Sequence, residues 1–138
     1  MKFYKPLFVL FILAAGAWAQ KPGEDPIALT LFPPELVMKY HQEINLDEGQ
    51  SRAIKDAIQK AQTKFLDMQW DMQAEAEKLA KLLKAPRVDE AAVLAQMDQV
   101  LNREREIKKA QISLLIHIKN LLSEAQQNKL MELRQKPS

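Results

Sequence analysis

The pentapeptide LDEGQ at residues 46–50 decides the fold, because the chain repeats its pattern as LSEAQ at residues 122–126. In each copy a capping side chain follows the Leu, and a Gln stands three residues after the cap. In such a capping box the cap accepts a hydrogen bond from a backbone N–H one turn on, and the Gln side chain bonds back to the N–H of the cap. The residues that define the two copies are Leu46, Asp47, Gln50, Leu122, Ser123 and Gln126. Because helical sequence also precedes each copy, each predicts a sharp corner between two helices.

The segment between the two copies carries apolar residues at heptad spacing, three and four residues apart. In its first half these are Ile54, Ile58, Ala61, Phe65, Met68, Met72, Leu79 and Leu82, and in its second half Val93, Met97, Val100, Ile107, Leu114, Ile118 and Leu121. Pro86 disfavours helical geometry at the residue before it, so it ends the first helix, and Asp89 can cap the second. Two long amphipathic helices with so short a connection are expected to form an antiparallel hairpin.

The register of this hairpin brings the two pentapeptides together. If Lys84 faces Asp89 across the turn, Gln50 lies beside Ser123 at the open end. The same register places an acidic ridge of the first helix next to the basic stretch at residues 102–109. The ridge consists of Asp67, Asp71 and Glu75. Cross-helix ion pairs of modest strength are therefore expected on a solvated face.

The whole pattern predicts an all-α protein of four helices, in which shorter helices flank the long hairpin at both ends. This helical domain spans residues 35–135. Residues 20–34 contain four prolines and a glycine, so they are expected to form an extended or disordered arm. Residues 1–19 have the features of a cleavable secretory signal peptide, with two lysines, an apolar run and the small-x-small site Ala17-Trp18-Ala19. The apolar run is much shorter than the ~20 residues that span a bilayer, so no membrane span is expected after cleavage.

Composition narrows the functional classes. Removal of residues 1–19 takes two lysines from the 20 basic residues and leaves 18, against 18 acidic residues in the chain. A neutral exported protein is a poor candidate for nucleic-acid binding, which normally requires a basic surface. The sequence has no cysteine, so packing or oligomerisation must supply the stability that disulfides would give. It also lacks a Gly-rich phosphate loop and a nucleophile-elbow sequence, and we expect no enzymatic activity.

An exported, cysteine-free, all-helical chain with two such motifs flanking a long hairpin resembles the CpxP/Spy group of periplasmic proteins, whose motif is written LTxxQ. The resemblance extends from Pro33 to Arg134. Asp47 and Ser123 stand where the motif has Thr, and both are also good N-caps. The resemblance implies a periplasmic location, a cradle-shaped antiparallel homodimer and ATP-independent chaperone activity on unfolded envelope proteins. It also implies, as an option, a part in an envelope-stress circuit with a membrane sensor or regulator.

Relatives of the ZraP and CnrX kind sense or bind metals, so the resemblance keeps a heavy-metal sensor or resistance protein as the alternative. His41 and His117 are the candidate ligands for Zn or Cu, because each lies five residues before the Leu of its motif. Other donors near them are Met38, Glu43 and Met131. The metal-sensing relatives carry H-x-x-x-H on the first helix and H-x-x-x-M on the third, whereas Val37 and Leu121 stand at the partner positions here. We therefore favour ordinary histidines and expect no cofactor.

Several apolar residues lie outside the heptad seam and are candidates for contact with a client protein or a second subunit. These are Trp70, Ile112, Leu115 and Ile116. The three on the second long helix make that helix apolar on two faces, and only one face can pack against the hairpin partner. Trp70 is two residues from Met68 on the seam, so it points elsewhere.

Overall fold

The computed structural model describes residues 25–136, and these residues contain helices and no strand. The chain divides into two compact units, Met1–Leu31 and Phe32–Ser138. The second unit holds α3 (Pro34–Lys39), α4 (Glu48–Leu83), α5 (Glu90–Leu121) and α6 (Glu124–Arg134). The predicted all-α fold, a long hairpin with a shorter helix at each end, is therefore confirmed. No described helix is long and apolar enough to span a membrane.

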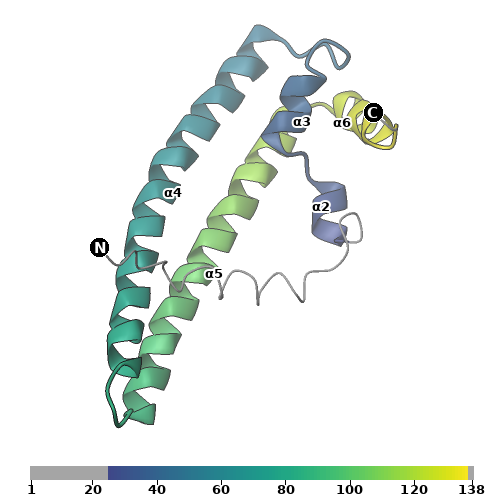
Figure 1. Ribbon diagram of the computed structural model, residues 1–138. Helices are drawn as coiled ribbons and strands as arrows, with labels where there is room; N and C mark the ends of the chain where they lie inside the picture. Colours follow the sequence, from purple (N-terminus) through teal and green to yellow (C-terminus); the bar gives the residue numbers. More distant parts are fainter. Residues whose placement is uncertain (1–24, 137–138) are drawn as a thin grey trace, which may run out of the picture. The chain divides into compact units, whose positions relative to one another are not determined.

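Helices α4 and α5 pack side by side as an antiparallel hairpin (Figure 1). The Asp47 side chain caps α4 by accepting from Gln50 N, and the Asp89 side chain caps α5 by accepting from Ala92 N. Between the helices, the N–H of Lys84 donates to the carbonyls of Ala80 and Lys81 and closes the last turn of α4. The seam positions Ile54 and Leu79 of α4 and Val100 and Ile118 of α5 are buried. The heptad pattern thus gives the observed packing.

The main core lies at the open end of the hairpin, where all four helices of this unit contribute. Its buried members are Phe32, Val37, Ile44, Ile54, Ile118, Leu122, Leu130 and Leu133. Four of them, Phe32, Val37, Ile118 and Leu130, are at most 1% exposed. The middle of the hairpin is thinner, and its seam residues Phe65, Met68 and Met72 are half-buried. The best-packed part of the unit is therefore the region that contains the two pentapeptides.

The segment expected to be an arm, residues 20–34, has local structure where it is described. Residues Pro26–Thr30 form the short helix α2, which Asp25 caps by accepting from Ile27 N. Proline is favourable at the first helical position because its missing N–H would have no helical partner there. Phe32, inside the same segment, is a core residue of the second unit. The structure thus differs from an extended arm at both places. The predicted signal peptide, residues 1–19, lies outside the described residues.

The acidic ridge also differs from expectation. Glu75 Oε2 accepts a hydrogen bond of 2.7 Å from Gln96 Nε2 of α5, and Glu75 Oε1 lies 3.3 Å from Lys78 Nζ on its own helix. The direct partner across the hairpin is therefore a neutral amide rather than a cation. The hydrogen bond from Gln96, followed by that from Lys78 and the charges of Lys78 and Arg103, lowers the pKa of Glu75, although partial burial opposes the shift.

Candidate functional site

Both predicted capping boxes are formed at the corners that begin α4 and α6. In the first, Gln50 N donates to Asp47 Oδ1 at 2.7 Å, and Asp47 N donates to Gln50 Oε1 at 3.2 Å. In the second, Gln126 N donates to Ser123 Oγ at 3.1 Å, and Ser123 N donates to Gln126 Oε1 at 2.9 Å. Each glutamine therefore satisfies the backbone of its own corner.

The two glutamines also bind each other across the hairpin. Gln50 Nε2 donates to Gln126 Oε1 at 2.8 Å, and Gln126 Nε2 donates to Gln50 Oε1 at 3.0 Å. The two side-chain amides thus form a closed, reciprocal pair. We call this arrangement the amide pair. It joins two residues that are far apart in the sequence, so it fixes the register of α4 against the start of α6.

The remaining amide hydrogens reach backbone carbonyls at the corner of the opposite half. Gln50 Nε2 donates to the carbonyl of Leu121 at 2.8 Å, where α5 ends. Gln126 Nε2 donates to the carbonyl of Ile44 at 3.1 Å, just before the first corner. The backbone at that corner adopts a positive φ of 52° at Asn45, a conformation that Asn tolerates better than most residues. The amide pair therefore supplies donors to one carbonyl at the end of α5 and to one in the turn segment before α4. Leu122 is buried beside these contacts and half-buried Leu46 packs against the same core.

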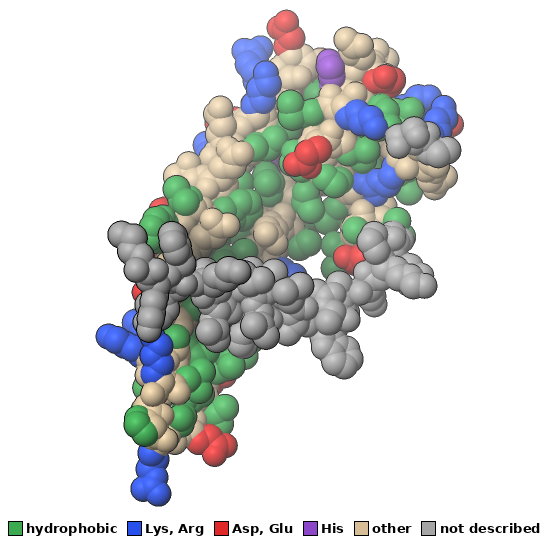
Figure 2. Space-filling model, viewed as in Figure 1, with side chains coloured by type: hydrophobic (Ala, Val, Ile, Leu, Met, Phe, Trp, Pro, Cys, Tyr) green, Lys and Arg blue, Asp and Glu red, His purple; other side chains and the backbone are tan. Residues whose placement is uncertain are grey.

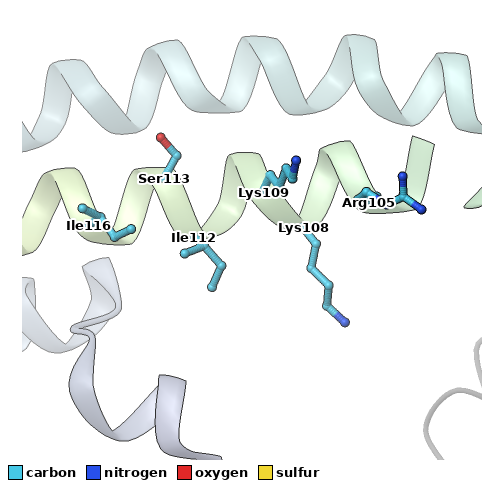
Figure 3. Close-up of a pocket in the computed structure, with 6 residues that line it drawn as sticks. All are labelled: Arg105, Lys108, Lys109, Ile112, Ser113 and Ile116. Carbon is cyan, nitrogen blue, oxygen red and sulfur yellow. The ribbon is translucent and has the colours of Figure 1, made fainter. Parts of the chain in front are cut away.

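A shallow hollow on α5 contains two of the four apolar contact candidates. Its lining residues are Arg105, Lys108, Lys109, Ile112, Ser113 and Ile116, and its volume is about 440 Å³ (Figure 3). Figure 3 shows Ile112 and Lys108 pointing away from α4, on the same side of α5. Ile116 is 45% exposed and Ile112 is half-buried. We call this surface the α5 face.

A second hollow extends toward α4 and shares Lys109 and Ser113 with the first. It has a volume of about 380 Å³, and its other lining residues are Lys64, Met68, Glu106 and Ala110. Its one acidic group, Glu106, lies 3.5 Å from Arg103 on the same helix. The α5 face is therefore apolar with an excess of positive charge.

The other two contact candidates lie outside the hollow. Leu115 is half-buried, and Trp70 is 64% exposed on α4. One turn before Trp70, Leu66 is 56% exposed, so the two side chains form a small apolar patch on α4. Other exposed apolar side chains of the described residues, including Leu83 and Val88, stand at the closed end of the hairpin. In Figure 2, which shows one side of the molecule, hydrophobic side chains are visible along the hairpin and down to its closed end.

The two histidines are both exposed, and one has a defined hydrogen bond. His41 Nδ1 lies 2.7 Å from the backbone carbonyl oxygen of Met38. Because a carbonyl can only accept, the Nδ1 carries the hydrogen, and in the neutral ring Nε2 keeps its lone pair. His117 is an exposed residue of α5. Among the residues that the structure describes, no three His, Cys, Asp or Glu side chains come together as a metal site.

Comparison with known proteins identifies the family of the chain. A family model described as heavy-metal resistance matches residues 7–133, which is almost the whole sequence. The protein belongs to the heavy-metal resistance family. This agrees with the resemblance to the CpxP, Spy, ZraP and CnrX proteins that the LTxxQ-type motifs suggest. Searches of the curated proteins and of the solved structures each found no match.

In this member of the heavy-metal resistance family, His41 and Met38 could supply some of the ligands of a metal ion but not a complete set. His41 offers an imidazole whose Nδ1–H is held by a carbonyl, an arrangement that orients Nε2 as it does in many metal sites. Met38, in the preceding turn, is 58% exposed and offers a thioether. A complete coordination shell would need more donors, from solvent or from a second chain.

Sequence reasoning missed three features of the site. It paired each glutamine with its own cap but not with the other glutamine, although the predicted register already brought Gln50 beside Ser123. It also missed Leu66 as the neighbour of Trp70, which i, i+4 spacing could have revealed. Finally, it did not anticipate the hydrogen bond between His41 and the Met38 carbonyl.

Proposed function

We propose that this protein holds non-native proteins on the α5 face without using ATP, in the periplasm. The observation that carries the proposal is the α5 face itself, where exposed or half-buried isoleucines stand beside three cationic side chains. A contiguous apolar surface beyond what the fold itself buries is a common mark of an interaction site.

The physical chemistry of this surface suits a holding function. Hydrophobic burial depends on area and not on exact partners, so an apolar face can bind many unfolded sequences. The cations of residues 105–109 add attraction for acidic segments and would speed encounter. Without a nucleotide cycle, release relies on modest affinity and on the client burying its own apolar groups as it folds.

The same proposal includes export, dimerisation and the partners expected from the sequence. Cleavage after residue 19 would export the protein, and a homodimer would bury further apolar surface such as the Leu66–Trp70 patch. The partners would be unfolded or misfolded envelope proteins, with a membrane sensor or regulator as a further partner in a stress circuit. Neither catalysis nor nucleic-acid binding is part of the proposal.

Ile112→Ser combined with Ile116→Ser tests the role of the α5 face. We expect the purified wild type, near stoichiometric amounts, to suppress aggregation of an unrelated denatured protein without nucleotide. The double variant should need about tenfold more protein for equal suppression, because two partly exposed isoleucines lose roughly 1 kcal/mol or less each in contact energy. Light scattering measures the suppression.

A matched control removes exposed apolar side chains from another part of the hairpin. Leu83→Ser with Val88→Ser alters residues that are 52% and 43% exposed near the turn. This control should suppress aggregation like the wild type. Circular dichroism must show unchanged helicity in both variants. Undiminished suppression by a folded Ile112→Ser, Ile116→Ser variant would show that clients bind elsewhere.

A metal-responsive role is the second candidate function. Two observations favour it, the heavy-metal resistance family and the orientation of His41 beside exposed Met38. Imidazole and thioether donors suit Cu(I), and imidazole also suits Zn²⁺ and Cu²⁺. His117, at the matching place before the second motif, is the other candidate ligand.

Titration calorimetry with Zn²⁺ and Cu²⁺ tests the second candidate. A saturable isotherm in the micromolar range should appear for the wild type and be lost in His41→Ala and in His117→Ala. Because protons compete with metals for the imidazole nitrogen, binding should weaken as the solution is acidified. Absence of saturable heat at neutral pH would remove the metal-responsive role.

A further inference from the structure

The hollow of the α5 face has a polar end and an apolar end. Its three cations, Arg105, Lys108 and Lys109, lie within two turns of the helix, and Ile112 and Ile116 follow in the next two turns. Figure 3 shows the same order along α5. The cationic and apolar groups are therefore separated along one axis rather than mixed.

The positive charge at the polar end is only partly compensated. None of the residues that line the hollow is acidic. Arg105 donates to the neutral amide oxygen of Asn102 at 3.2 Å. Within residues 25–136, the ion pairs of the structure do not include Lys108 or Lys109. Glu106, which lines the neighbouring hollow with Lys109, pairs with Arg103 at 3.5 Å, so an anionic group at this end would still meet an excess of positive charge.

We propose that the hollow binds a free anionic amphiphile with a single alkyl chain, such as a fatty acid. The carboxylate would lie beside Lys108, with Arg105 and Lys109 adding attraction at longer range, and the alkyl chain would cover Ile112 and Ile116 (Figure 3). From Lys108 to Ile116 the helix rises ~12 Å, a distance that a medium-length alkyl chain can follow. Because the hollow is shallow and open, the alkyl chain would lie along the surface of the helix.

Other occupants match the hollow less well. A cationic amphiphile would place its head among like charges, and a hydrophilic anion would leave the isoleucines without a partner. A second copy of α5 running antiparallel about Arg105 would set cation against cation. An anionic amphiphile fits the hollow because its charged head and apolar tail are separated in the same way as the cations and the isoleucines.

This inference concerns the same surface as the proposed function but does not require that non-native proteins bind there. If both hold, the amphiphile and a client would compete for Ile112 and Ile116. The amphiphile can therefore be tested without any client protein.

The test follows backbone amide NMR shifts of the purified protein during titration with dodecanoate below its micelle concentration. Two compounds with the same tail serve as controls, dodecyltrimethylammonium with a cationic head and dodecyl maltoside with a neutral head. We expect saturable shifts confined to residues 105–116 and affinity for dodecanoate about tenfold higher than for either control. Lys108→Glu should reduce the affinity about tenfold, whereas Lys55→Glu, the same charge change at an exposed α4 position outside the hollow, should not.

Three results would overturn the proposal. Equal affinity for all three compounds would show a purely apolar contact, and shifts centred on other residues would place the ligand elsewhere. Binding to vesicles that contain anionic lipids, with no response to monomeric dodecanoate, would show a membrane surface contact instead. Failure of aggregation suppression alone would not bear on the amphiphile, so the two proposals can fail separately.

Discussion

Replacing either Gln50 or Gln126 by alanine is expected to destabilise the protein by about 2–4 kcal/mol. Part of the loss comes from the bond that the glutamine Oε1 accepts from the backbone N–H of Asp47 or Ser123, worth about 0.5–1.5 kcal/mol, whereas the cap side chain keeps its own bond to the backbone N–H of residue 50 or 126. The rest comes from the half-buried amide of the other glutamine and from the carbonyl of Leu121 or Ile44, which lose their partner, because an unsatisfied buried polar group costs roughly 1–3 kcal/mol. Urea unfolding followed by circular dichroism measures the change.

The double variant distinguishes the amide pair from two independent caps. Each single substitution leaves the other glutamine with an unsatisfied amide, whereas the double substitution removes both amides together. The free energy lost in Gln50→Ala with Gln126→Ala should therefore be smaller than the sum of the single losses, by roughly 1 kcal/mol or more. Gln73→Ala, which removes an exposed bond to Glu77, is the control and should cost less than about 0.5 kcal/mol. Strict additivity would mean that the two corners are independent.

Phe32→Ala is expected to destabilise the protein by about 3–5 kcal/mol, the usual range for a buried phenylalanine. Phe32 is 1% exposed, and the Arg134 guanidinium lies 5.2 Å from the centre of its ring. Partial burial lowers the pKa of Arg134, but the group stays charged at every accessible pH, so this cation–π contact persists. The substitution removes both the ring from the core and the surface against which Arg134 rests.

Ile27→Ala supplies the matched comparison for Phe32. Ile27 is 52% exposed in α2, only five residues earlier, and its truncation should cost less than about 1 kcal/mol. Thermal or urea unfolding of the two variants gives the comparison. If Phe32→Ala were as mild as Ile27→Ala, Phe32 would behave as part of a loosely attached arm, as the proline content of residues 20–34 predicts.

The hairpin could be predicted because its determinants are local or periodic. Apolar residues three and four apart define the buried face of each long helix, and Pro86 with Asp89 marks the turn. The capping boxes could be predicted because cap and glutamine lie within one turn of each other. In the structure α4 ends at Leu83 and α5 begins at Glu90, each within a few residues of Pro86 and Asp89.

The features that could not be predicted depend on contacts between distant segments. The proline content of residues 20–34 argues for an arm before α3, but it does not reveal that Phe32 is buried in one core with residues of α3, α5 and α6. Likewise, charge patterns suggested a cation opposite Glu75, whereas side-chain geometry brought the Gln96 amide to it. The amide pair combines both kinds of information, since the register was predictable but the orientation of two flexible side chains was not.

In the candidate site, too, periodic features could be predicted from the sequence, and side-chain arrangements could not. Surplus apolar residues on α5 identified Ile112 and Ile116 from periodicity alone. Whether such residues line a common hollow, and which charges accompany them, depends on side-chain directions. Trp70 was grouped with them in the sequence but belongs to a separate patch on α4 with Leu66. Membership of the heavy-metal resistance family is compatible both with the binding of non-native proteins and with a response to metals.

Site-specific photo-crosslinking tests most directly whether non-native proteins bind the α5 face. A photoreactive phenylalanine analogue is placed at Ile112 in one variant and at exposed Val88 near the turn in another, and each variant is irradiated with a denatured client in the absence of nucleotide. We expect a strong client adduct from position 112 and little from position 88. A yield at position 88 equal to or greater than that at position 112 would contradict client binding at the α5 face.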